Sequence, residues 1–327
     1  MRKIFFVLLM SLSSLPYSFS QTRTEAFNQN VELGAISWYR DYDEALAASK
    51  AEHKPVLILF QEVPGCTTCR NYGNNVLSHP LLSEAIENEF IPLAIFNNKG
   101  GKDAAVLKKY REPSWNNPVV RIVNASGENL VNRIAGNYTA LGLYQGMQKA
   151  LLKEQITPPA YMEILAEELQ LRPDNTKQAV YSMYCFWSGE KALGSLAGVV
   201  KTEAGFSGGR EVVKVTYNKD EISKETIDAF AQRNSISPII GNAKFRAALN
   251  DEDYYLQRSL YRYLPLSEVQ RTKINSLIGQ GVDPTYILSP SQERWLELIK
   301  NKTIAKENRS ENSFKTEFLD LKRIYSL

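Results

Sequence analysis

The feature that most constrains the fold is a continuous apolar run, Val56 to Phe60, that is followed closely by two cysteines. Pro55 precedes the run and polar residues follow it, so the run predicts a buried strand. Cys66 and Cys69 come next, with two residues between them, and lead into an expected helix. This order of strand, cysteine turn and helix predicts an α/β fold for the first half of the chain.

The position of the two cysteines favours redox chemistry. A cysteine between a buried strand and a helix lies among unpaired backbone N–H groups, which favour its thiolate. Cys69 lies one helical turn after Cys66, so it can resolve a mixed disulfide formed at Cys66. A buried structural disulfide and two inert thiols are the alternatives, and the strand-then-helix context favours the redox pair.

Cysteine and histidine usage restricts the other possibilities. The chain of 327 residues has three cysteines, and the third, Cys185, stands apart from the pair. An exported protein held together by structural disulfides would more often show an even, dispersed set. The two histidines, His53 and His79, are not at ligand spacing with the cysteines. We therefore expect neither a metal nor another cofactor.

Charge and the N-terminus indicate where the protein works. The 39 basic and 36 acidic side chains leave a formal charge of +3, which gives no electrostatic footprint for nucleic acid. Residues 1–20 combine Arg2 and Lys3, an apolar stretch from Ile4 to Met10, and a small-x-small site at Ser18 to Ser20. This pattern predicts a signal peptide, and hence a periplasmic location in a diderm bacterium.

The same segment is too short to span a membrane. Its apolar run falls well below the ~18 to 20 residues that a spanning helix needs. No cysteine lies near the cleavage point, and no later segment is long and apolar enough to cross a bilayer. We therefore expect a soluble mature protein without lipid attachment or stable membrane insertion.

Further motifs after the cysteine pair indicate a known fold. Asn117-Pro118 opens a second apolar strand that runs to Val123, and the turn Asn124 to Gly127 leads to an expected strand from Leu130 to Ile134. With the CxxC motif, this order resembles the thioredoxin superfamily over roughly residues 35–152. The resemblance implies that Pro118 is the cis-proline that faces the cysteines and contacts the substrate.

The residues next to the cysteines indicate a more specific family within this superfamily. Val63-Pro64-Gly65-Cys66 is similar to the bacterial thioredoxin-like VPGUxxT family, in which selenocysteine can occupy the first reactive position. Cys69 stands where that family name has threonine, which favours ordinary exchange between two thiols. We place the thioredoxin-like domain at residues 31–152 and an interdomain linker, expected to be a polar helical spacer, at residues 153–175.

The second half contains a lone cysteine beside aromatic residues. A strand from Val180 to Tyr184 is expected to end at Cys185-Phe186-Trp187, with a helix from Glu190 to Leu196. Taken alone, such a cysteine is usually a packed core residue. Two further segments, Gly205 to Gly209 and Glu211 to Tyr217, follow in order and favour a functional cysteine over a core residue. Together these segments resemble the peptide methionine sulfoxide reductase A family over about residues 178–300.

That resemblance implies an α+β domain, which we place at residues 176–300, and a set of roles. Cys185 would attack the sulfoxide sulfur, and Glu211 would donate a proton to its oxygen. Phe186 and Trp187 would hold the substrate methyl group. The family often reduces the oxidised nucleophile with a later cysteine, which is lacking here. Cys66 would then attack oxidised Cys185.

The sequence also departs from this family. Tyr184 stands where the family has glycine, and Arg210 alone separates Gly209 from Glu211, which deletes a stretch with an active-site tyrosine. Asp253 and Gln257 fall near the positions of a downstream aspartate and tyrosine. A domain that only binds a substrate or partner therefore stays an alternative to an active reductase.

Two enzymatic functions and one non-catalytic reading remain. The first is an exported reductase for methionine-S-sulfoxide in proteins, with the thioredoxin-like domain as its electron donor. The second is a general thiol–disulfide oxidoreductase with a degenerate binding domain, and the third is a scaffold. The expected partners are oxidised exported proteins or peptides and an upstream thiol donor.

Helix-start and helix-face patterns complete the prediction. Three pairs have capping spacing and predict helix starts, namely Asp41 with Glu44, Ser267 with Gln270, and Ser289 with Gln292. In the tail, residues 301–327, four apolar side chains recur at helical spacing, namely Phe314, Phe318, Leu321 and Ile324. This spacing predicts a terminal helix packed on the second domain.

Overall fold

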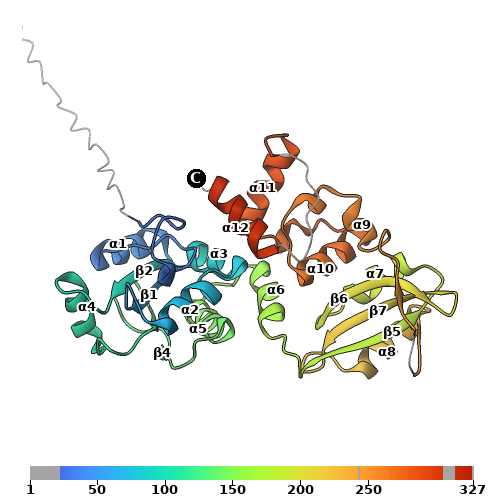
Figure 1. The fold of residues 1–327 in the computed structure, drawn as a ribbon, viewed down its shortest axis with the longest axis horizontal. Coiled ribbons are helices and arrows are strands. Elements are labelled where there is room, and N and C mark those ends of the chain that lie inside the picture. Colours follow the sequence, from blue (N-terminus) through green and yellow to red (C-terminus); the bar gives the residue numbers. More distant parts are fainter. Residues whose placement is uncertain (1–22, 242–243, 305–313, 326–327) are drawn as a thin grey trace, which may run out of the picture.

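The computed structural model describes residues 23–241, 244–304 and 314–325. The predicted signal peptide, residues 1–20, lies outside the described residues. Within them the chain forms two β-sheets, each with its own helices, and Figure 1 shows the two halves on either side of helix α6. No helix in these three ranges is both long enough and apolar enough to cross a membrane.

The N-terminal half is built on a mixed sheet in the order β2-β1-β3-β4. β1 pairs in parallel with β2 and antiparallel with β3. The strands are β1 (Val56–Gln61), β2 (Ile91–Phe96), β3 (Val119–Val123) and β4 (Ile134–Ala135). The helices are η1 (Val31–Leu33), α1 (Tyr42–Glu52), α2 (Thr67–Asn75), α3 (Pro80–Glu89), α4 (Lys102–Tyr110) and α5 (Ala140–Lys153).

Local sequence explains most of this half. All six residues of β1 are buried, as its continuous apolar run predicts. The Asp41 side chain accepts hydrogen bonds from the amides of Asp43 and Glu44, which confirms the predicted start of α1. The strand predicted from Leu130 to Ile134 is shorter and later, because β4 pairs with β3 only at Ile134–Ala135.

The C-terminal half is built on an antiparallel sheet in the order β8-β5-β7-β6-β9. Its strands are β5 (Thr176–Ser182), β6 (Val199–Ser207), β7 (Arg210–Asn218), β8 (Ser237–Pro238) and β9 (Arg246–Ala247). Helices α7 (Phe186–Gly194) and α8 (Lys224–Arg233) accompany it. The long β6–β7 hairpin turns at Gly208 and Gly209, which both have positive φ. Two adjacent left-handed residues suit a tight hairpin turn and favour glycine.

The segment 153–175, predicted as a polar helical linker, contains a helix that is packed in the core. It contains α6 (Ala160–Leu169), and the side chains of Tyr161, Met162 and Leu165 are buried in the core. Tyr161 also donates a hydrogen bond to Glu89 at the end of α3. The segment therefore connects the sheets as part of a continuous core.

A helical layer follows the second sheet. It comprises α9 (Tyr254–Gln257), η2 (Leu260–Tyr263), α10 (Glu268–Gly279), η3 (Pro284–Ile287), α11 (Pro290–Lys300) and α12 (Phe314–Tyr325). Ser267 and Ser289 form complete capping boxes with Gln270 and Gln292, as predicted.

The predicted terminal helix, α12, packs on both halves of the molecule. Its Phe318 ring contacts Trp295 of α11 edge-to-face, with 4.8 Å between ring centroids. Its other neighbour is α3 of the N-terminal half, beside which it lies in Figure 1. The prediction of packing on the second domain alone was therefore incomplete, because a helix face shows that a partner exists but not which one.

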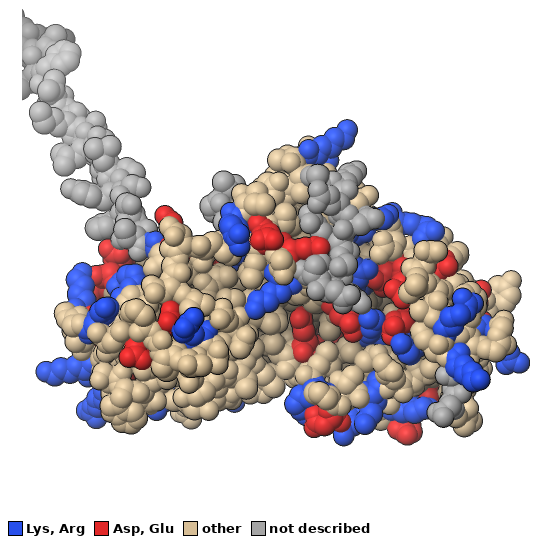
Figure 2. All heavy atoms as spheres, in the orientation of Figure 1, with Lys and Arg blue, Asp and Glu red and all other residues tan. Residues whose placement is uncertain are grey.

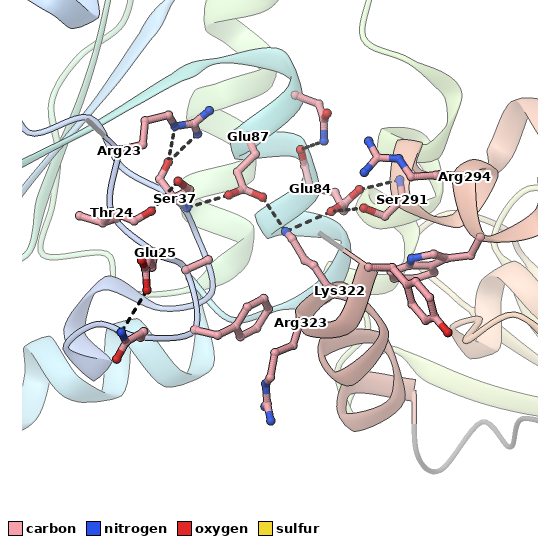
Figure 3. Close-up of a pocket in the computed structure, with 16 residues that line it drawn as sticks. Arg23, Thr24, Glu25, Ser37, Glu84, Glu87, Ser291, Arg294, Lys322 and Arg323 are labelled. Carbon is pink, nitrogen blue, oxygen red and sulfur yellow. Dashed lines mark hydrogen bonds and ion pairs between the residues drawn. The ribbon is translucent and has the colours of Figure 1, made fainter. Parts of the chain in front are cut away.

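An ionic cluster fixes α12 against α3 (Figure 3). Lys322 Nζ lies 3.1 Å from Glu84 Oε1 and 2.6 Å from Glu87 Oε2, and all three side chains are buried or nearly so. Burial alone would lower the pKa of Lys322, but the two carboxylates outweigh it and the pKa is raised. From α11, the backbone amide and hydroxyl of Ser291 both donate to Glu84.

The charged surface fits the small net charge. Figure 2 shows Lys and Arg side chains interspersed with Asp and Glu over the face in view. Mixed charge of this kind provides no extended basic surface there for a nucleic-acid backbone.

Candidate active sites

The first candidate site is the cysteine pair at the start of α2. Cys66 is the N-cap residue of α2 and is exposed, whereas Cys69 lies within the helix and is fully buried. Their Sγ atoms are 3.7 Å apart, so the pair is in the dithiol form. The separation is short enough for one thiol to attack a mixed disulfide at the other.

The two thiols have opposite electrostatic environments. The backbone amide of Cys69, and then that of Thr68, lower the pKa of Cys66 by donating to its sulfur. Burial raises the pKa of Cys69 to about 12. Cys66 is therefore the thiol of the pair that ionises more readily, and its role as the attacking thiolate stays a prediction.

The strand that faces the cysteines is placed as the resemblance implies. The Asn117–Pro118 peptide bond is cis, and Pro118 is buried at the start of β3. The side-chain oxygen of Asn117 accepts a hydrogen bond from the Cys69 thiol. Pro118 therefore lies beside the pair, and its contact with a substrate stays a prediction. A second cis bond, Val63–Pro64, precedes the cysteines.

Glu32 supports the cysteine loop from a distant part of the chain. Its side chain is buried, and Glu32 Oε1 accepts a hydrogen bond of 2.9 Å from the amide of Gly65. A Cβ atom at Gly65 would lie only 2.3 Å from the carbonyl oxygen of Glu62, so glycine is required there. Sequence reasoning missed Glu32, because nothing in its local pattern distinguishes it from other acidic residues.

Glu62 provides a third group, beside the two thiols, that could act as a metal ligand. One carboxylate oxygen of Glu62 and the Sγ atoms of Cys66 and Cys69 all lie within 4.8 Å of one another. Structural zinc sites use four protein ligands, and these residues supply three. The predicted absence of a metal therefore stays a prediction.

The second candidate site surrounds Cys185. Cys185 is the N-cap residue of α7, three residues after the end of β5, and is partly exposed. It opens into a cavity of about 310 Å³, whose lining includes Met183, Ser188, Lys191 and Ser235. The predicted strand ends two residues early, at Ser182, so that Tyr184 leaves the sheet and is 99% exposed. Cys185 thus shares with Cys66 a position among first-turn N–H groups.

Glu211 lies at the same helix start. It is on β7, and its carboxylate accepts a hydrogen bond of 2.8 Å from the backbone amide of Phe186. Glu190, on α7, is fully buried and accepts a hydrogen bond from the amide of Ala204. Burial raises the pKa of Glu190 well above its ordinary value. The hydrogen bond from the Phe186 amide therefore holds Glu211 beside the residue that follows Cys185.

The predicted substrate-binding aromatics form a stack. Phe186 is buried and lies nearly parallel to Trp187, with 5.8 Å between ring centroids. The ring of Tyr254 covers Trp187, with 3.8 Å between centroids. The guanidinium of Arg258 lies 3.5 Å from the centre of the Tyr254 ring. One indole face, where a substrate methyl group was expected, is therefore occupied by Tyr254.

Tyr255 is a residue of this site that sequence reasoning missed. Burial, and then the nearby Cys185, raise the pKa of Tyr255. The sequence comparison pointed instead to Asp253 and Gln257. Asp253 forms an ion pair of 2.6 Å with Arg271, and Gln257 is the last residue of α9. The sequence offered one signal for Tyr255, namely that tyrosines occupy both positions 254 and 255 of the same segment.

Comparison with known proteins supports both halves of this description. Residues 37–125 match a family model described as thioredoxin-like. This match agrees with the α/β sheet and the placement of the cysteine pair. The predicted thioredoxin-like fold of the N-terminal domain is therefore confirmed.

Curated relatives match a separate, shorter stretch. The chain is 39% identical over 61 residues to the peptide methionine sulfoxide reductase MsrA of Methanococcus maripaludis, covering 14% of this chain and 39% of that protein. It is 35% identical over 72 residues to the mitochondrial peptide methionine sulfoxide reductase of Mus musculus, covering 17% and 31%. The chain thus spans about a third of the length of these relatives.

One solved structure is also similar. A protein described as a DsbH oxidoreductase aligns with a TM-score of 0.32 and 19% identity, covering 37% of this chain and 88% of its own. The family match and the curated relatives together describe a thiol-redox protein with an oxidoreductase fold.

Proposed function

We propose that this protein is an exported reductase for methionine-S-sulfoxide in proteins or peptides, with Cys185 as nucleophile and the Cys66–Cys69 pair as electron donor. The observation that carries the proposal is the start of α7, where Cys185 caps the helix and the Glu211 carboxylate bonds to the next amide. A nucleophilic sulfur and a proton donor at one position are the two groups that sulfoxide reduction needs.

The first step transfers the oxygen atom. The Cys185 thiolate attacks the sulfoxide sulfur while Glu211 supplies a proton to its oxygen. The resulting hydroxyl group then moves to the Cys185 sulfur as the S–O bond and the transient S–S bond to the substrate break. Methionine and a Cys185 sulfenic acid result, so the substrate is reduced by two electrons and Cys185 is oxidised.

The second step restores the nucleophile. The Cys66 thiolate attacks the sulfenic acid sulfur and releases water, which leaves a Cys66–Cys185 disulfide. Cys69 then attacks Cys66, so the pair ends as a disulfide and Cys185 as a thiol. The exposed, low-pKa Cys66 and the buried, high-pKa Cys69 suit these successive roles. An upstream thiol donor would then reduce the pair.

A second function is favoured by one specific observation. Tyr254 covers the Trp187 ring, and Phe186 is buried, so the expected methyl-binding surface is filled. The C-terminal half would then bind a substrate or partner for a general thiol–disulfide oxidoreductase whose chemistry is confined to Cys66 and Cys69.

The decisive experiment uses fully reduced mature protein without added reductant. It is incubated with a peptide that contains the S-epimer of methionine sulfoxide, and both methionine and free thiols are measured. We expect methionine to form while Cys66 and Cys69 become oxidised, and Cys185→Ser to abolish its formation. If no methionine forms even with excess dithiothreitol, the reductase is excluded and the oxidoreductase with a binding domain is retained.

A further inference from the structure

We propose that Cys185 is reduced by the Cys66–Cys69 pair of a second copy of this chain, and not by the pair in its own chain. The inference rests on the proposed reductase function and concerns only the route of its electrons. The observation behind it is that the two thiol sites lie apart, with packed helices between them.

Each thiol is surrounded by its own half of the molecule. In the part of the chain that the structure describes, the contacts of Cys66 and Cys69 come from the N-terminal half, namely their own loop, Gln61 of β1 and Asn117. The cavity at Cys185 is lined only by residues 183–192 and 234–236. In Figure 1, α2 and α7, which carry these thiols, lie on opposite sides of α6 and α10.

The first part of the barrier between them is the buried ionic cluster (Figure 3). Lys322 of α12 is held by Glu84 and Glu87 of α3, and Glu84 also accepts two hydrogen bonds from Ser291 of α11. A hinge at this interface would separate buried opposite charges, which is strongly unfavourable. The cluster therefore keeps the N-terminal half in place against the helical layer.

The second part joins the helical layer to the C-terminal sheet. Lys273 of α10 is buried, and its ammonium donates to the carbonyl oxygens of Leu196 and Val199. The same ammonium lies 3.5 Å from the Glu167 carboxylate of α6. One cation therefore ties α6, α10 and the segment after α7 together.

Apolar packing closes the space between these ionic contacts. A single hydrophobic cluster runs from the first half to the second, and it includes Leu82 and Ile86 of α3, Met162 and Leu165 of α6, Ile274 of α10, Trp295 of α11 and Phe318 of α12. Relative motion of domains is expected only where their interface is small or polar. A continuous apolar core excludes the swing that would bring Cys66 to Cys185.

Both thiol sites also present large apolar side chains to solvent. Trp115, two residues before Asn117, is 81% exposed, and Tyr138, which contacts Tyr72 of α2, is 41% exposed. Tyr184, directly before Cys185, is 99% exposed. Exposed aromatics of this size commonly anchor protein contacts. We assign them to the contact between the Cys66 site of one copy and the Cys185 site of another.

The electron balance is that of the proposed cycle, divided between two molecules. Cys66 of the donor copy attacks the Cys185 sulfenic acid of the acceptor copy, water leaves, and an intermolecular disulfide forms. Cys69 of the donor then displaces the Cys185 thiol. The donor loses two electrons and the acceptor regains its reduced nucleophile.

Mixing two variants, each of which lacks one part of the electron route, tests this proposal. The donor variant is reduced Cys185→Ser, and the acceptor variant carries both Cys66→Ser and Cys69→Ser. With methionine-S-sulfoxide peptide and no small thiol, the acceptor alone should stop at one equivalent of methionine. Adding about five equivalents of donor should raise the yield to about six equivalents, with the donor thiols oxidised.

The opposite result overturns the inference without touching the proposed function. In that result, the mixture stops at one equivalent of methionine, while the unmodified protein forms about two equivalents at a rate per molecule that does not depend on its concentration. Electron transfer then occurs within one chain. If the acceptor forms no methionine even with excess dithiothreitol, the proposed reductase function itself fails. A separate exported dithiol protein as sole donor is indicated if only an added thioredoxin regenerates the acceptor.

A trapped intermediate and a surface variant locate the contact. A donor with Cys69→Ser and Cys185→Ser cannot resolve its mixed disulfide, so it should accumulate a Cys66–Cys185 cross-link with the oxidised acceptor. Trp115→Ser in the Cys185→Ser donor should slow transfer by roughly fivefold or more. The matched control is Tyr286→Ser, since Tyr286 is 56% exposed on η3. Equal transfer rates for the Trp115→Ser and Tyr286→Ser donors would show that Trp115 is not part of the contact.

Discussion

The amide of Phe186 donates a 2.8 Å hydrogen bond to the carboxylate of Glu211, which joins the start of α7 to strand β7. The two residues are 25 positions apart in the sequence. This bond holds the Glu211 carboxyl group beside the residue that follows Cys185, at the start of α7. It therefore fixes the geometry of the proposed proton donor before any substrate arrives.

Glu211→Gln separates this structural role from proton transfer. Glutamine keeps an oxygen that can accept from the Phe186 amide, but it cannot deliver a proton. We expect methionine formation with excess dithiothreitol to slow by about 10²- to 10⁴-fold, the usual contribution of a general acid. Glu203→Gln, which removes the partner of Lys214 on the same hairpin, is the control. Unchanged kinetics in Glu211→Gln would exclude it as the donor.

Tyr254→Ala should improve substrate binding if the stack on Trp187 must open for the substrate. Breaking an aromatic pair costs about 0.5–1.5 kcal/mol, and the Arg258 contact about 0.5–1 kcal/mol. Removing that cost should lower KM by roughly 5- to 60-fold, with little change in kcat. Steady-state kinetics with dithiothreitol give both constants. A higher KM in Tyr254→Ala would instead make Tyr254 part of the substrate site.

Alkylation should distinguish the two thiols of the pair. Since N–H donors lower the pKa of Cys66 and burial raises that of Cys69 to about 12, iodoacetamide should modify Cys66 and leave Cys69 unmodified near neutral pH. The midpoint of the rate–pH curve should lie below that of cysteine in the unfolded chain. Mass spectrometry of the labelled peptide checks both statements, and preferential labelling of Cys69 would reverse the assigned roles.

The same burial predicts a loss of stability in alkali. The folded pKa of Cys69 is raised, so its contribution is complete below the unfolded pKa and is lost as the pH rises toward about 12. In Cys66→Ser, where Cys69 is the only thiol of the pair, urea midpoints should fall over this range. Cys66→Ser with Cys69→Ala should show a smaller fall, and equal falls would assign the effect to other groups.

Lys322→Met should weaken the docking of α12. The substitution keeps the length of the side chain but leaves Glu84 and Glu87 without their buried cation, a change worth about 3–5 kcal/mol. Faster proteolysis of the region and a lower unfolding midpoint are the expected signs. Arg323→Met, at the exposed neighbouring position, should stay within about 0.5 kcal/mol. Adding Glu84→Gln and Glu87→Gln should recover part of the loss.

Local signals in the sequence predicted the local structure well. The caps at Asp41, Ser267 and Ser289 and the buried strand β1 follow from residues within a few positions of one another. The position of Cys66 at the start of α2 follows in the same way. Such features depend on backbone hydrogen bonds and apolar burial within one element.

Contacts between distant segments could not be predicted in this way. The bond from Gly65 to Glu32, the approach of Tyr255 to Cys185, and the seat of α12 on α3 each join residues from separate elements. One sequence records that a residue is acidic or aromatic, but not which loop will lie beside it. For the same reason the packing of α6 in the core was not foreseen, although its helical character was.

The ionic cluster at Lys322 has a consequence for synthesis on the ribosome. The sheet of the N-terminal half needs no residue beyond Ala135, so it can form early in translation. Glu84 and Glu87, however, receive their cation only after α12 has emerged, more than two hundred residues later. Until then α3 presents two acidic side chains and an apolar surface without their final cover. A first domain that folds before α12 is in place would therefore lack the ionic partner and part of the apolar cover of its α3 side.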